Sequence, residues 1–284
     1  MNNGIICDCI AARSIPDPGL IPGSGFISSK AHPDMLSIVI LVLAGLLAGG
    51  LNAVAGGGTF ISYPALIWLG IPPVSANATA TLTALPGYIA SAWAFKKEIN
   101  KESKADLFRI LAISIIGGCI GALLLLNTSD RVFSGIVPHL MLFATALFAF
   151  GPKLIARIKG DGRLGLVAAA IIILIVSVYG GYFNGGLGIM LLASFTIIGY
   201  RNLHFMNGMK NLISAILSSA SAIIFIFSGL IDWHSAVILG TATAIGGVVG
   251  GHYSTQIKNT SYLRVFIMLV GLSLSVIFFV QNYF

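Results

Sequence analysis

Long apolar segments separated by short polar loops are the feature that most constrains the fold of this chain. A helix that crosses the hydrocarbon core of a bilayer needs about 20 mostly apolar residues. Eight segments reach that length: 36–55, 74–95, 107–126, 132–151, 164–183, 207–228, 234–253 and 262–281. Two further apolar stretches, 59–70 and 187–200, are shorter. The sequence therefore predicts an all-α polytopic membrane protein with about eight full transmembrane helices plus two short half-helices or re-entrant segments.

Composition agrees with a lipid bilayer as the surrounding medium. Charged residues make up 9% of the chain, whereas a soluble globular domain carries about 25%. The formal charge of +7 could indicate nucleic-acid binding. The lysines and arginines, however, lie in short loops between apolar runs, as in the cytoplasmic loops of membrane proteins. We expect a multi-pass protein of a bacterial cell membrane that binds no nucleic acid, and a homo-oligomer is left open.

Residues 1–34 differ from the rest of the chain. They contain four prolines and no apolar periodicity, and the first long apolar run begins at Met35. A secretory signal needs an apolar stretch of about 7–15 residues, which this segment lacks. We expect a disordered tail, and one explanation is that Met35 is the natural start of the protein.

The second half of the chain repeats the plan of the first. Four short matches occur in the same order at offsets of 129 to 132 residues: "GGLN" ending at Asn52 with "GGYFN" ending at Asn184, Asn77 with Asn207, "ASAWAF" at 90–95 with "ASAIIF" at 220–225, and "GGCIG" at 117–121 with "GGVVG" at 246–250. A period of half a chain indicates a duplicated transporter-like unit. The expected parts are a membrane repeat at 35–151, a cytoplasmic linker at 152–163 and a second membrane repeat at 164–284.

The distribution of basic residues indicates how the two repeats are oriented. Each repeat holds five segments, so five crossings would place the second repeat upside down relative to the first. If 96–106 lies inside, alternation also places 151–163, 201–210 and 254–264 inside. These loops hold twelve of the sixteen lysines and arginines, and Arg109 at a cytoplasmic helix end is the thirteenth. The predicted outside loops hold only Arg131. Because cytoplasmic loops are enriched in lysine and arginine, the sequence predicts two inverted repeats with both termini outside.

Two glycine clusters interrupt the apolar segments at matching places. Gly56, Gly57 and Gly58 precede the short segment 59–70, and Gly185-Gly186-x-Gly188 opens the short segment 187–200. An interrupted helix frees backbone polar groups that lipid cannot satisfy, so such breaks persist only against protein or a watery cavity. Transporters bind anions there, at the positive N-terminal ends of half-helices. The alternative is that these glycines only permit tight turns or close helix packing.

Neutral polar residues gather near both breaks and give the predicted substrate site. Neutral donors suit an anion that must bind and leave again, whereas the alternative is that asparagine and threonine hold helices together. Lys210 could attract anions at a cytoplasmic mouth, but a helix-end lysine that reaches toward the membrane surface is the alternative. The predicted substrate-binding residues are Asn52, Gly56, Gly57, Gly58, Thr59, Asn77, Thr79, Asn184, Gly185, Gly186, Asn207, Lys210 and Asn211.

Residues for catalysis or metal binding are not evident. All nine acidic residues lie in the tail, loops or helix ends, so no carboxylate is available near the midplane for a proton or sodium relay. The chain has no G-x-S-x-G or H-E-x-x-H motif, and its three cysteines form no metal-ligand set. We expect no catalytic residues, no metal and no cofactor, and hence no enzyme.

The stretch "GLLAGGLNAVAGGGTFISYPALIWLGIPPVSANAT" at 45–79 and the stretch "GLIDWHSAVILGTATAIGGVVGG" at 229–251 resemble the TauE/SafE family of sulfite exporters and sulfonate permeases. The likeness runs from about residue 35 to the end of the chain. The second half departs from the family pattern, because Leu187 breaks its glycine triplet and Ser194 stands near the expected proline. The resemblance implies transport of sulfite, sulfonates or related small sulfur-containing anions.

Three other functions can be compared with small sulfur-anion transport for an apolar chain of this length. A transporter of another small anion, such as a carboxylate, would use the same plan. A membrane assembly subunit without a substrate would not need glycine-broken helices at matching positions of two halves. A membrane-embedded enzyme would need convergent catalytic groups. The sequence thus favours a small-anion transporter, with the substrate, the direction and any coupling ion left open.

Overall fold

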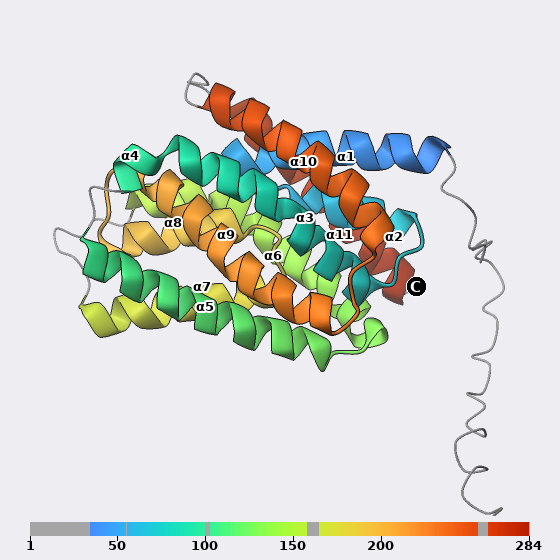
Figure 1. The fold of residues 1–284 in the computed structure, drawn as a ribbon, viewed down its shortest axis with the longest axis horizontal. Helices are drawn as coiled ribbons and strands as arrows, with labels where there is room; N and C mark the ends of the chain where they lie inside the picture. The colour runs from blue at the N-terminus through green and yellow to red at the C-terminus, as the bar shows by residue number, and fades with distance from the viewer. Residues whose placement is uncertain (1–34, 55, 100–102, 158–164, 255–260, 284) are drawn as a thin grey trace, which may run out of the picture. The chain divides into compact units, whose positions relative to one another are not determined.

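The computed structural model describes residues 35–54, 56–99, 103–157, 165–254 and 261–283, which lie within one compact unit, Pro33–Phe284. The predicted tail 1–34 lies outside the described residues. Figure 1 shows that the described secondary structure is entirely helical. The helices are α1 (Met35–Val54), α2 (Thr59–Trp68), α3 (Pro73–Ala94), α4 (Lys96–Ile99), α5 (Lys104–Leu126), α6 (Asp130–Arg157), α7 (Leu166–Tyr182), α8 (Leu187–Ile198), α9 (Leu203–Phe227), α10 (Trp233–Ser254) and α11 (Ser261–Tyr283).

All ten predicted apolar segments are helical, and the main differences from the expectation are an additional helix, a longer α6 and an earlier start of α9. The four-residue helix α4 is additional, in a stretch that was expected to be a loop. Helix α6 continues to Arg157, so the first part of the predicted linker 152–163 is helical and the rest lies outside the described residues. The continuation is physically reasonable because no glycine or proline after Pro152 interrupts that stretch.

Within the described residues, four helices are long and apolar enough to cross a membrane, which indicates an all-α membrane protein. These spans are Met35–Ala53, Ala105–Leu126, Leu203–Phe227 and Trp233–Gly250. Helix α3 has 22 residues, but its asparagines, threonines and serines lower its hydropathy, and most of its side chains are buried against other helices. Helix α7 has 17 residues, or about 26 Å at 1.5 Å per residue. The number of helices that cross the bilayer remains a prediction.

Helices α2 and α8 are short and are bounded by glycines in the same backbone conformation. They contain 10 and 12 residues, so each is about 15–18 Å long, roughly half of the hydrocarbon core. Gly56 and Gly186 precede them with φ of 76° each, and Gly70 and Gly199 follow them with φ of 81° and 109°. Positive φ is a conformation that glycine adopts without steric cost. The same turn chemistry thus delimits both short helices.

The outer helices pack as close pairs, α1 along α10 and α5 along α7. A Cβ atom placed on Gly45 of α1 would lie 2.6 Å from the Cβ of Ala242 on α10. One placed on Gly117 of α5 would lie 2.5 Å from the Cβ of Ser177 on α7. Both glycines belong to G-x-x-x-G spacings, which let helix backbones approach closely. These glycines therefore serve helix packing.

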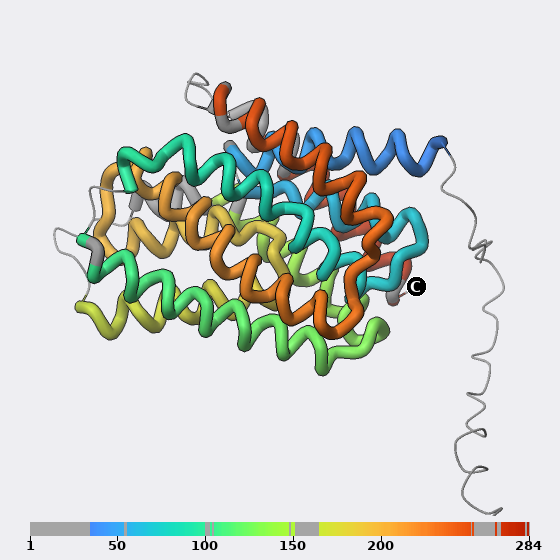
Figure 2. The backbone as a smooth tube through the Cα atoms, viewed as in Figure 1, coloured from blue at the N-terminus to red at the C-terminus, as the bar shows by residue number. Residues whose placement is uncertain are grey.

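Helices α3 and α9 contact each other and connect the two pairs, because α3 also packs on α10 and α9 on α5. Figure 2 traces the backbone through this arrangement. In Figure 1, α4 and the starts of α5, α7 and α9 lie at the left, and the α2–α3, α5–α6 and α9–α10 connections lie at the right. The loops predicted to be inside and outside therefore lie at opposite ends of the helices.

Candidate functional site

The first break lies between α1 and α2, and Asn52 braces it. The side-chain oxygen of Asn52 accepts a hydrogen bond of 2.7 Å from the N–H of Gly58. A Cβ atom on Gly58 would overlap the carbonyl oxygen of Ala48 and lie 2.7 Å from the amide carbon of Asn52. The start of α2 therefore lies directly against α1, at a distance that only glycine permits.

The second break lies between α7 and α8, and side chains from three helices hold it. The Asn184 side chain accepts a hydrogen bond of 3.0 Å from the Tyr88 hydroxyl and donates one of 2.9 Å to Ser218. The Tyr179 hydroxyl donates a bond of 2.7 Å to the carbonyl of Gly185. Asn184 thus joins the break to α3 and α9.

The two breaks meet. A Cβ atom on Gly56 would lie 2.7 Å from the Cα of Gly188, so the two backbones are in direct contact. Asn52 and Asn184 are both buried, with 1% and 0% of their surface exposed. Segments that are about 130 residues apart in the sequence are therefore brought together at one buried place.

Three other predicted residues lie close to one break or away from both. Asn77 donates a hydrogen bond of 2.9 Å to the carbonyl of Tyr182, the last residue of α7. Thr79 instead accepts a bond of 3.0 Å from the N–H of Asp232, in the connection before α10. Thr59, the first residue of α2, is buried and its hydroxyl has no partner among the described residues. Thr59 and Asn77 therefore belong near the breaks, and Thr79 anchors a loop.

Lys210 differs from the expectation that it reaches toward the membrane surface. It is the eighth residue of α9 and its exposed fraction is 0%. Its ammonium group has no hydrogen-bond partner among the described residues. The interpretation as a surface-reaching helix-end lysine is therefore wrong, because α9 begins at Leu203, four residues before the expected start, and carries Lys210 two turns inward.

Tyr88, Tyr179 and Ser218 were not among the predicted site residues, although the sequence contains a signal for Tyr88 and Ser218. Polar and aromatic residues follow one face of α3 and one face of α9 at spacings of three, four or seven residues, which keep side chains on one side of a helix. The two stripes are Asn77, Thr81, Tyr88 and Ser91 on α3, and Asn207, Asn211, Ser214, Ser218 and Ser221 on α9. Reading these stripes as helix faces would have placed Tyr88 and Ser218 beside the predicted asparagines.

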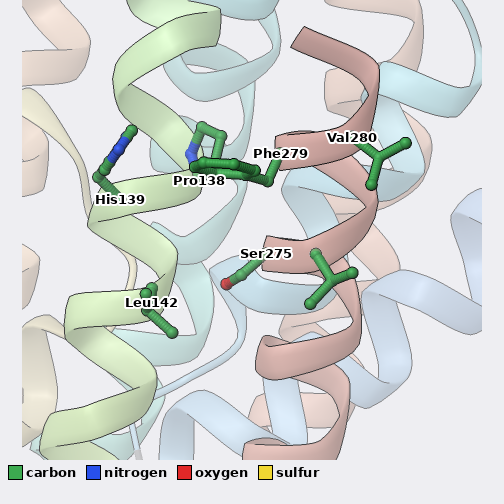
Figure 3. A pocket seen from close by; sticks show the side chains of 7 residues that line it. Pro138, His139, Leu142, Ser275, Phe279 and Val280 are labelled. Carbon is green, nitrogen blue, oxygen red and sulfur yellow. The ribbon is translucent and has the colours of Figure 1, made fainter. Parts of the chain in front are cut away.

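A groove between α6 and α11 contains none of the predicted site residues. Figure 3 shows its lining, which is mostly apolar. The side chains come from Pro138, His139, Leu142, Ser275, Val276, Phe279 and Val280. His139, the ionisable residue among them, has its ring bonded to the carbonyl of Gly135 at 3.0 Å. The groove therefore offers little to hold an anion.

Comparison with known proteins identifies the family. The family model described as "Sulfite exporter TauE/SafE" matches residues 41–277, which include both glycine breaks. The chain belongs to the TauE/SafE family. The resemblance seen in the sequence is thereby confirmed, and it covers the helices from α1 to α11.

Curated TauE/SafE-like relatives match over most of their length. A protein of Haemophilus influenzae described as "Probable membrane transporter protein" is 27% identical over 84% of this chain and 92% of the relative. A protein of Escherichia coli K12 described as "Probable membrane transporter protein YfcA" is 27% identical over 84% of this chain and 88% of the relative. A protein of Sinorhizobium described as "Probable membrane transporter protein ORF9" is 25% identical over 84% of this chain and 91% of the relative.

Proposed function

We propose that this TauE/SafE family member transports small anions of the sulfite and sulfonate class across a bacterial cell membrane. The observation that carries the proposal is the direct contact of two interrupted helices at Gly56 and Gly188. Interrupted helices at membrane depth are the usual place for substrate in secondary transporters. The family description names sulfite export, and relatives that align over most of their length are described as membrane transporters.

The proposed architecture is two inverted repeats, and the helix contacts support it. Under the correspondence of α1 with α7, α2 with α8, α3 with α9, α5 with α10 and α6 with α11, the contacts of one half reproduce those of the other. The α1–α10 pair becomes α7–α5, α3–α10 becomes α9–α5, and α2–α11 becomes α8–α6. The α3–α9 and α6–α11 contacts map onto themselves. Such exchange is expected of two related units that face each other.

The proposed binding groups are the backbone N–H groups at the starts of α2 and α8, together with Thr59 and Asn77. The N-terminal end of a helix carries a partial positive charge. Some of these N–H groups are already bonded, such as those of Gly58, Phe60 and Leu187, so the charge of the helix ends would provide much of the attraction. Asn52 and Asn184 use their amides to brace the breaks, so we assign them the role of positioning residues. Each hydrogen bond to a charged partner contributes about 1.5–3 kcal/mol, so a few bonds would give weak, reversible binding.

Flux in proteoliposomes tests the proposal. Purified protein should carry labelled sulfite and sulfoacetate faster than protein-free vesicles, with labelled acetate as the carboxylate probe. Gly56→Ala should lower this flux strongly, because residue 56 has φ of 76° and lies against Gly188. Gly50→Ala is the matched control, since its added Cβ would be 3.7 Å from the nearest atom, an ordinary contact.

Three results would contradict the proposal in different ways. Flux of acetate without either sulfur anion would make the substrate a carboxylate. Parent-like flux in Gly56→Ala would place the site away from the breaks. Absence of flux of all three anions in the parent protein would overturn the transport function itself.

A further inference from the structure

Three neighbouring polar side chains on α9 are buried without partners. They are Lys210, Asn211 and Ser214, with exposed fractions of 0%, 0% and 1%. Among the described residues, the Lys210 ammonium, both polar atoms of the Asn211 amide and the Ser214 hydroxyl have no hydrogen-bond partner. Residues spaced by three and four positions lie on one side of a helix, so the three side chains form one cluster.

A buried ammonium group without a counter-ion is unusual. Burial removes its hydration, and buried charges in proteins are normally paired. On α5, which packs against α9, Asp106 bonds Arg109 of its own helix at 3.3 Å. Helix packing alone gives no reason for a lysine here, since the neighbouring Met209 and Ile213 fill the core in the ordinary way.

The cluster lies apart from the glycine breaks. Ser218, which bonds Asn184 of the second break, follows Lys210 by eight residues, or about 12 Å along the helix axis. Helical side chains lean toward the N-terminus of their helix. Lys210 therefore leans away from the break, toward the end of the helices where α4 lies (Figure 1).

Contacts between α9 and α3 show more closely where the cluster lies along the helix axis. A Cβ on Gly208 would lie 2.9 Å from the Cβ of Phe95, and Ala215 packs with Tyr88. Lys210, Asn211 and Ser214 lie between these two levels. The cluster therefore occupies the interior beside the last two turns of α3, between the breaks and the α4 end.

We propose that Lys210, Asn211 and Ser214 form an oxyanion-binding subsite, separate from the breaks, on the route between them and the α4 end. The inference rests on the proposed anion transport and adds a second, positively charged binding site to the transport route. The ammonium, amide and hydroxyl groups offer up to six N–H and O–H donors, more than one monodentate acceptor can use. Sulfite or a sulfonate group presents three oxygens on one centre and would accept charge-assisted bonds from all three side chains.

The subsite occurs in one half of the chain. The residue that corresponds to Lys210 at the offset of 130 is Ala80, which is small and fully buried. The proposed duplication therefore accounts for the presence of α9 as the counterpart of α3, but it does not account for a lysine at position 210. A charge added to one copy of a repeated helix points to a function in that copy.

Thermal unfolding of the full chain in detergent tests the subsite, with sodium sulfite as the probe and sodium chloride at matched ionic strength as the blank. Sulfite should raise the parent's Tm. Lys210→Met should unfold at an equal or higher temperature than the parent without sulfite, because a buried charge with no partner among the described residues is removed. Its sulfite-dependent rise should be clearly smaller than the parent's, because only the site at the breaks still binds sulfite. Lys97→Met is the matched control, since Lys97 is an exposed lysine of α4 and its loss should leave the rise intact.

Two further variants and a flux measurement also test the subsite. Asn211→Leu and Ser214→Ala should each raise the half-maximal sulfite concentration several-fold, and they replace Lys210→Met if that variant does not insert. A parent-like sulfite response in Lys210→Met, or in both substitutes, would overturn the subsite. So would a parent protein whose Tm does not respond to sulfite. Parent-like flux in Lys210→Met would likewise reject the subsite while leaving the transport function standing, whereas absent flux in the parent would reject the transport function.

Discussion

At the scale of single residues, the amides near the breaks serve geometry more than binding. Asn52 holds the first turn of α2 through Gly58, and Asn184 joins α7–α8 to α3 and α9. An amide whose groups are already bonded offers little to a ligand. Among the described residues, the Thr59 hydroxyl and the polar groups of the Lys210 cluster have no hydrogen-bond partner and so keep their capacity to bind.

Replacing Gly58 by Ala should destabilise the protein more than replacing Gly50 by Ala. The new Cβ at 58 would overlap the carbonyl oxygen of Ala48, whereas the one at 50 makes an ordinary contact at 3.7 Å. Overpacking of a tight interior costs typically about 1–3 kcal/mol. The Tm of the two purified variants gives the comparison, and equal values would show that α2 can move away from α1 without penalty.

Replacing Tyr88 by Phe should also lower stability, by about 1 kcal/mol or somewhat more. It deletes a buried hydrogen bond and leaves the Asn184 oxygen without that donor. Tyr283→Phe is the control, because its hydroxyl bonds the Gly135 carbonyl at an exposed position. Unfolding midpoints of the two variants should differ in this order, and the reverse order would contradict the bracing role of Asn184.

The sequence could predict which residues lie near the breaks, but it could not predict their hydrogen-bond partners. The paired glycines and asparagines stand out because they recur at one offset. Whether a polar side chain bonds its own break, as Asn52 does, or a distant loop, as Thr79 does with Asp232, depends on tertiary contacts between segments far apart in the chain. The burial of Lys210 was missed for a related reason, since it depends on where α9 begins.

At the scale of helices, the sequence predicted most of the fold because length and apolarity determine a membrane helix almost alone. All ten expected segments are present as helices. The four-residue α4 was missed since its sequence, Lys-Lys-Glu-Ile, is too short and too polar for an apolar-run criterion. The length of α6 was underestimated because its last turns contain lysine and arginine, which end an apolar run without ending a helix.

The close pairing of α5 and α7 leads to a prediction about helix packing. Gly121→Ala would press a Cβ against the carbonyl oxygen of Val178 and to within 2.6 Å of the N–H nitrogen of Tyr182. We expect the helices to separate and the yield of monodisperse protein in detergent to fall. Gly135→Ala, whose Cβ would have its nearest neighbour at 3.7 Å, should leave the elution profile unchanged. A normal profile for Gly121→Ala would show that this pair tolerates a wider spacing.

At the scale of the whole molecule, the two ends of the helices should face different compartments. Lys97 is exposed at the α4 end and Ser129 is exposed in the connection between α5 and α6, at the other end (Figure 1). In a chain whose native cysteines are replaced, Ser129→Cys should react with an impermeant thiol reagent in intact cells. Lys97→Cys should react only after the cells are opened.

The labelling pattern follows from the excess of lysine and arginine in the loops assigned to the inside. Labelling of residue 97 from outside, with protection of residue 129, would reverse the orientation. Labelling of both from one side would remove the basis for inverted repeats. The sequence predicts this orientation, whereas the packing of α10 on α1 and of α5 on α7 depends on contacts between segments far apart in the chain.

The contact of Gly56 with Gly188 limits how such a protein can diversify. At that point main chain touches main chain, so no side chain exists there that mutation could lengthen, shorten or recharge. A change of ligand preference must therefore arise at flanking positions, because the contact between Gly56 and Gly188 itself offers no side chain to a ligand. Under the proposed duplication, sequence differences between the two halves are expected to accumulate away from this contact.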